Sequence, residues 1–74
     1  MADVTIDARG LQCPIPIAKI SARMFEMNSG QILEIMADDL PFSQDVQAYC
    51  EVSGNELVSL EECGNCFTAI IKKS

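Results

Sequence analysis

The spacing of apolar residues changes twice in the first half of the chain, and this change constrains the fold more than any other feature of the sequence. Residues 4–8, VTIDA, alternate apolar and polar side chains, as a half-buried strand does. From Pro14 onward apolar residues recur every three or four positions, which predicts a helix with one apolar stripe: Ile17, Ile20, Met24 and Met27. The nearly continuous apolar run 31–37 then predicts a strand in the middle of a sheet.

The second half of the chain predicts another helix followed by two strands. In DDLPFSQDVQAYC, residues 38–50, Asp38 or Asp39 is expected to cap a helix that has Pro41 in its first turn. Gly30 is expected to end the first helix as a left-handed cap. The strands 56–62 and 66–72 flank Gly-Asn, which suits a type II′ hairpin turn.

This order of elements, β-α-β-α-β-β, fits one small domain over residues 1–74, because a chain of this length does not support two cores. Right-handed crossovers make the first three strands parallel, and the hairpin makes the fourth antiparallel. We therefore expect a two-layer α/β sandwich with sheet order 1-2-4-3 and both helices on one face. The carboxyl ends of the first three strands then share an edge with Cys13, the loop 38–45 and the hairpin tip 63–66.

Charge and composition exclude several classes of function. Acids outnumber bases 11 to 5, which disfavours direct binding to nucleic acid or to membranes and favours protein partners. The chain has no histidine, which excludes Ser-His-Asp and Cys-His catalysis and every His-containing zinc site. No signal peptide and no membrane-spanning run of roughly 18 apolar residues is visible, so we expect a cytoplasmic protein. Separately, we expect a monomer.

The stretch RGLQCPIP, residues 9–16, places Cys13 at the expected start of the first helix. With Cys13 as N-cap, Pro14 at the first and Pro16 at the third helical position would begin the helix without breaking it. The positive end of the helix dipole and the nearby Arg9 then predict a Cys13 pKa below about 8.5. The alternative is a small buried cysteine that only fills the loop, but the two prolines favour a reactive one. Two residues before Cys13 would supply a tight turn and an apolar anchor: Gly10 and Leu11.

The longer stretch DARGLQCPIP, from Asp7 to Pro16, resembles the signature of the TusA/SirA family of small sulfur carriers. The likeness continues through Gly30, ADD at 37–39 and the Tyr49-Cys50 pair to the terminal lysines. The resemblance implies the same β-α-β-α-β-β sandwich and a persulfide carrier that needs no cofactor and has no small-molecule reaction of its own. Cys13 would accept sulfur from a cysteine desulfurase or rhodanese-like protein and pass it to an acceptor protein, in tRNA thiolation, molybdenum cofactor synthesis or sulfur oxidation.

The other cysteines are assigned less directly. Cys50 falls on the apolar side of the second helix and is expected in the core. CGNC, residues 63–66, departs from what the family leads us to expect. Cys63 and Cys66 flank a hairpin turn, whereas the Cys-x-x-Cys motif of thioredoxins begins a helix. Three readings stay open for this pair: ordinary turn residues, a redox-sensitive pair, or part of a metal site, although two cysteines supply only half of a tetrahedral set.

Charged residues near the motif are candidates for docking. Lys19 and Arg23 lie four apart on the first helix, either as a solvated face or as a patch for an acidic partner. Asp38, Asp39 and Asp45 are interpreted first as capping and first-turn acids, and second as a surface for a basic donor or acceptor. Two functions compete with the sulfur carrier: a thiol redox or metal-binding module that uses Cys63 and Cys66, and a regulatory domain that only binds a partner.

Overall fold

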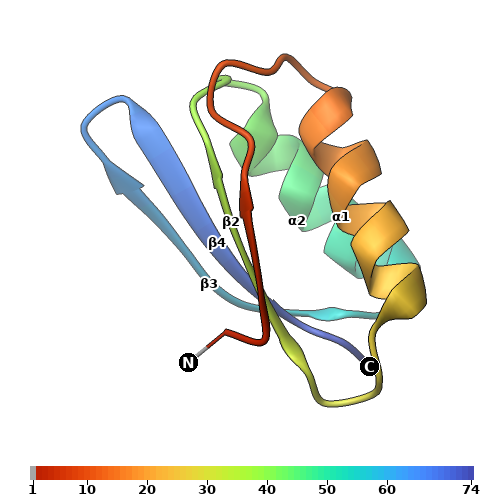
Figure 1. Cartoon of the computed structure of the whole chain (residues 1–74). Helices are drawn as coiled ribbons and strands as arrows, with labels where there is room; N and C mark the ends of the chain where they lie inside the picture. The colour runs from red at the N-terminus through yellow and green to blue at the C-terminus, as the bar shows by residue number, and fades with distance from the viewer. Residues whose placement is uncertain (1) are drawn as a thin grey trace.

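The chain forms a four-stranded sheet with two helices packed on one of its faces, as Figure 1 shows. The computed structural model describes residues 2–74, with Cys63 described in its backbone alone. The elements follow the predicted order: β1 (Val4–Asp7), α1 (Ile15–Glu26), β2 (Ile32–Ala37), α2 (Phe42–Ser53), β3 (Glu56–Cys63) and β4 (Cys66–Lys72). Within residues 2–74, neither helix is long and apolar enough to cross a membrane.

The sheet has the predicted order β1-β2-β4-β3. β1 and β2 pair in parallel, while β4 lies between β2 and β3 and runs antiparallel to both. The β3–β4 hairpin turns at Gly64, whose φ of 65° is of the sign that a type II′ turn requires at its first central residue. The β1–α1 loop, the β2–α2 loop and the hairpin tip consequently lie at the same end of the sheet (Figure 1).

The core lies between the sheet and the helices. Alternate residues of β2 and β4 face the helices because side chains alternate along a strand, and they are buried: Leu33, Ile35, Ala37, Phe67, Ala69 and Ile71. From the helices, Ile20, Met24, Val46 and Cys50 are also buried. The rings of Phe42 and Phe67 lie with their centroids 6.3 Å apart at the end of the core nearest the two βα loops. The core therefore holds the first turn of α2 directly beneath those loops.

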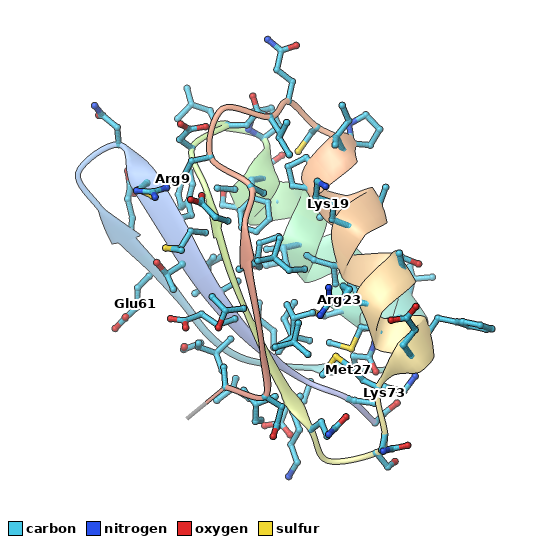
Figure 2. All side chains as sticks on the ribbon, viewed as in Figure 1. Arg9, Lys19, Arg23, Met27, Glu61 and Lys73 are labelled. Carbon is cyan, nitrogen blue, oxygen red and sulfur yellow. The ribbon has the colours of Figure 1, made fainter. Side chains whose placement is uncertain are left out.

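The end of α1 differs from the prediction. The helix ends at Glu26 with Met27 as its C-cap, and Gly30, with a φ of 88°, belongs to a separate turn closed by the Gln31 N–H and the Asn28 carbonyl. Instead, the ammonium group of Lys73 donates a hydrogen bond of 2.8 Å to the Met24 carbonyl. Figure 2 shows Lys73 beside Met27 at this end of α1. A cation from the other end of the chain thus satisfies a terminal carbonyl and complements the negative end of the helix dipole.

Candidate functional site

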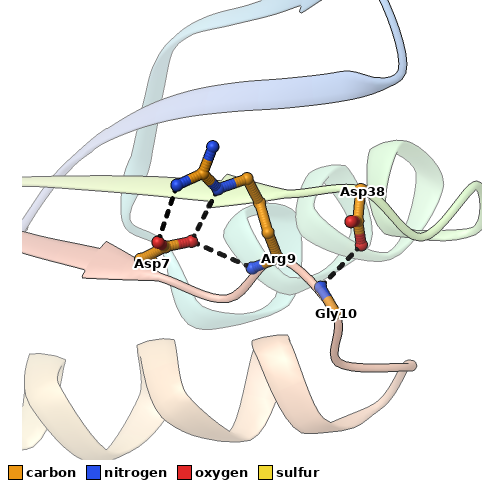
Figure 3. A network of polar contacts seen from close by, with 4 residues as sticks. All are labelled: Asp7, Arg9, Gly10 and Asp38. Atoms are coloured by element: carbon orange, nitrogen blue, oxygen red, sulfur yellow. Dashed lines mark hydrogen bonds and ion pairs between the residues drawn. The ribbon is translucent and has the colours of Figure 1, made fainter.

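Two loops meet at the carboxyl ends of β1 and β2. The Gly10 N–H donates to Asp38 Oδ1 at 2.9 Å, which Figure 3 shows, and the Cys13 N–H donates to Asp39 Oδ2 at 3.0 Å. The prediction that Asp38 or Asp39 caps α2 is therefore wrong: Pro41 is its N-cap, with no side-chain cap. The loop N–H groups lie outside the strand ladder and need acceptors, and the carboxylates supply charge-assisted ones. Gly10 makes the turn possible with a φ of 86°, as expected.

Arg9 forms a bidentate pair with Asp7 (Figure 3). Its Nη2 lies 2.8 Å from Asp7 Oδ2, and its Nε donates to Oδ1 at 2.9 Å. Hydrogen bonds from Arg9 lower the pKa of Asp7 to about 2, and the carboxylate raises the pKa of Arg9. Both side chains are about half exposed, so the pair contributes little to stability. Arg9 is thus engaged by a carboxylate, and it is not among the charges that act on Cys13.

The start of α1 also differs by one residue from the prediction. Pro14, not Cys13, is the N-cap, so Pro16 occupies the second helical position. The Ile15 N–H donates to the Gln12 carbonyl at 2.9 Å, and the Cys13–Pro14 peptide bond is cis. Pro14 and Pro16 have no N–H group, and the N–H group of Ile15 already donates to the Gln12 carbonyl. The first turn therefore has few free N–H groups to offer a thiolate, although these groups are the basis of the helix-terminus effect.

The thiol of Cys13 is partly buried and packs against the core. Burial raises its pKa to about 12, helped by hydrogen bonding to Asp45 and Asp39 and by their negative charges. The predicted lowering of this pKa is therefore wrong. The main physical reason is burial of the sulfur, and the second is that a carboxylate from each of two neighbouring segments faces it where the sequence had suggested a cation. At neutral pH Cys13 is a protonated thiol in the free protein.

An open apolar groove begins beside Cys13 and runs between the two helices. Its volume is about 400 Å³, and its lining comprises Pro14, Ile17, Asp45, Ala48, Tyr49 and Val52. The side chain of Val52 is 89% exposed. The sequence reasoning did not identify this groove. A signal was present, however, because Val52 is apolar and falls outside the buried stripe of α2, which contains Phe42, Val46 and Cys50.

Lys19 and Arg23 lie on another side of α1. Both are exposed, as expected (Figure 2). With Ile6 and Ala22 they line a second cavity of about 210 Å³. The two cavities share no lining residue. The structure therefore brings Asp39 and Asp45 to Cys13 and leaves the two cations apart from it.

The remaining cysteines are distributed over the fold. Cys50 is 5% exposed and belongs to the core, as predicted. The backbone register places Cys63 directly opposite Cys66, but the Cys63 side chain lies outside the described residues. Cys66 is a free, partly buried thiol on the sheet face opposite the helices, because its neighbour Phe67 points into the core. Among the described side chains, no three His, Cys, Asp or Glu residues are arranged so that they could hold a metal ion.

Comparison with known proteins agrees with this architecture. Residues 4–73 match the family model described as sulfurtransferase TusA. The chain belongs to the TusA family. It is 40% identical over 72 residues to the sulfur carrier protein TusA of Allochromatium vinosum, which covers 97% of this chain and 95% of that protein. A crystal structure of a SirA-like protein from Desulfitobacterium hafniense has the same fold, with a TM-score of 0.82 and 27% identity over 93% of this chain and 95% of that one.

Proposed function

We propose that this TusA-family protein carries sulfane sulfur as a persulfide on Cys13 between a protein donor and a protein acceptor. The observation that carries the proposal is the position of Cys13: a partly exposed free thiol at the carboxyl edge of the sheet, directly before Pro14, which lines a groove. Cys50 is buried, and Cys66 lies on the opposite face of the sheet. Cys13 is therefore the described thiol that a partner reaches at this edge from the side of the helices.

Loading is a thiol exchange that consumes no oxidant and no reductant. The sulfur of Cys13 attacks the outer sulfur of a cysteine persulfide on the donor, and the donor's S–S bond breaks as the new bond forms. The donor cysteine leaves as a thiolate and takes up the proton that Cys13 gives up. Delivery is the same step reversed, with an acceptor thiolate attacking the outer sulfur and Cys13 leaving.

The carboxylates around Cys13 favour the loaded form. They oppose negative charge on the Cys13 sulfur, and release of sulfur from Cys13 creates that charge. In the persulfide, the charge resides on the outer sulfur, about 2 Å farther along the S–S bond. Because thiols of high pKa are poor leaving groups, the carrier retains its sulfur against small thiols in solution. Delivery then requires an acceptor that changes the charge near Asp45 and Asp39.

The test is transfer from a cysteine desulfurase supplied with cysteine, followed by intact mass. We expect one added sulfur atom on the wild-type chain, which a reducing agent removes, and none on Cys13→Ser. Cys66→Ser is the matched control and should load like wild type, because Cys66 lies on the other face of the sheet. Loading of Cys13→Ser would contradict the assignment of Cys13.

A further inference from the structure

The sulfur-transfer step proposed for Cys13 does not use the groove between α1 and α2, yet the groove opens beside that residue. Pro14, which follows Cys13, and Asp45, which acts on its thiol, both line the groove. From Asp45 to Val52 the lining follows α2 for about 10 Å, or two helical turns. Apart from the Tyr49 hydroxyl, which accepts a hydrogen bond from Asn55, its walls are apolar except at the Cys13 end, where the Asp45 carboxylate lies.

The charged side chains that α2 contributes around the groove are all acidic. α2 contains Asp45 and Glu51 and no base, and residues 24–71 contain no lysine or arginine. The cations of α1, Lys19 and Arg23, line the other cavity. A second copy of this chain is a poor occupant, because each copy has a net charge of −6 and the two would repel.

We propose that this groove receives an apolar segment of a partner protein in the sulfur relay, with a lysine or arginine of that segment placed against Asp45. Apolar side chains of the segment would cover Ala48, Tyr49 and the exposed Val52. The cation would complement the carboxylate at the groove's end, where the partner's reacting sulfur must also come close to Cys13.

Docking in this position has a chemical consequence. The Asp45 carboxylate helps to raise the pKa of Cys13, so a cation that neutralises this carboxylate makes the Cys13 thiolate easier to form. The free carrier would be unreactive towards other electrophiles, and contact with the correct partner would activate it. This inference rests on the proposed carrier function, but the groove can be tested without any transfer of sulfur.

The probes are two short helical peptides with leucine at positions i, i+3, i+4 and i+7, one with lysine and the other with glutamate at the remaining positions. Binding to the full chain is measured by fluorescence anisotropy. We expect the lysine peptide to bind more tightly than its twin. Asp45→Asn should weaken it about two- to fivefold, as loss of one exposed ion pair does, and Val52→Ser about fivefold through lost apolar contact.

Matched controls lie on β3, away from the groove. Glu61→Gln removes one negative charge, as Asp45→Asn does, and Figure 2 shows Glu61 on the far side of the sheet from α1. Val58→Ser makes the same substitution as Val52→Ser at another exposed position, where Val58 is 49% exposed. Both should bind the lysine peptide within twofold of wild type. Bound lysine peptide should also speed alkylation of Cys13 in wild type and much less in Asp45→Asn.

Three results would overturn the proposal: equal binding of both peptides, equal weakening by the control variants, or a dimer of this chain that Val52→Ser dissolves. The last would assign the groove to a second copy. If the desulfurase experiment fails while the peptide results hold, the carrier function falls and the docking surface stands. If Cys13 loads normally and both groove variants behave like their controls, only the docking surface falls.

Discussion

The rate at which Cys13 is alkylated in the free protein gives a direct measure of its environment. Burial and the carboxylates of Asp45 and Asp39 raise its pKa from 9.0 to about 12. At pH 8 the thiolate fraction is then lower by roughly a thousandfold, because each unit between pH and pKa costs a factor of ten. A thiolate of higher pKa is a better nucleophile, and this raises the rate constant of the thiolate by roughly 20-fold at a Brønsted coefficient of about 0.4–0.5. The net expectation is alkylation roughly 50-fold slower than that of a cysteine in the unfolded chain.

The informative perturbation is Asp45→Asn, which removes one negative charge while keeping the size of the side chain. Asp45 is a better choice than Asp39, because Asp39 also accepts the Cys13 N–H and its replacement would disturb the loop. We expect alkylation at pH 8 to accelerate severalfold and the apparent pKa of Cys13 to fall. The return towards its ordinary pKa is incomplete, because burial is the largest cause of the shift and the substitution leaves it in place.

The assay is reaction with iodoacetamide from pH 7 to 11, with the Cys13 peptide quantified by mass after digestion. Glu62→Gln is the control, since it removes the same charge from an exposed site on β3. A wild-type apparent pKa below about 8.5 would refute the reasoning, because it would mean that the helix N-terminus dominates the carboxylates. Equal acceleration by Asp45→Asn and Glu62→Gln would show that the effect reflects net charge and not the local contact.

Two further predictions concern the frame of the site. Lys73→Met should lower the free energy of unfolding, measured by urea denaturation, by about 1 kcal/mol, because it removes the hydrogen bond to the Met24 carbonyl. Lys72→Met is the control and should change this free energy by less than about 0.5 kcal/mol. Equal effects of the two substitutions would show that the hydrogen bond is not stabilising. The Asp7 carboxyl should titrate by NMR near pH 2, and near 3.8 in Arg9→Ala. Because folding lowers this pKa, the contribution of the pair is present above pH 3.8 and is lost as the pH falls through 2, and an unchanged midpoint in Arg9→Ala would contradict the pairing.

Much of the architecture followed from local patterns. The two helices, the four strands and the sheet order were all predicted, because apolar periodicity, turn residues and the handedness of crossovers act over short stretches of chain. The same reasoning correctly placed Cys50 in the core and Cys13 in the loop between β1 and α1, at the edge where the loops open.

Two errors arose because a local rule took no account of a partner distant in sequence, and a third because it took no account of a near neighbour. Asp38 or Asp39 was expected to cap the helix beside it, but each accepts an N–H from the β1–α1 loop, and Asp39 accepts that of Cys13, 26 residues away. At the end of α1, Lys73 and not Gly30 satisfies a carbonyl. Arg9 was expected near the thiol, but its own neighbour Asp7 holds it.

The sequence by itself determined which cysteine lies just before the first helix and at which edge of the sheet it lies, because those depend on prolines, glycine and strand order. The charge around that cysteine was decided only by the tertiary structure. Packing of Phe42 and Val46 into the core orients α2 so that Asp45 faces Cys13, and the β2–α2 loop brings Asp39 to the same place. Electrostatic effects on a thiol depend on distance and burial, and no stretch of sequence near Cys13 contains that information.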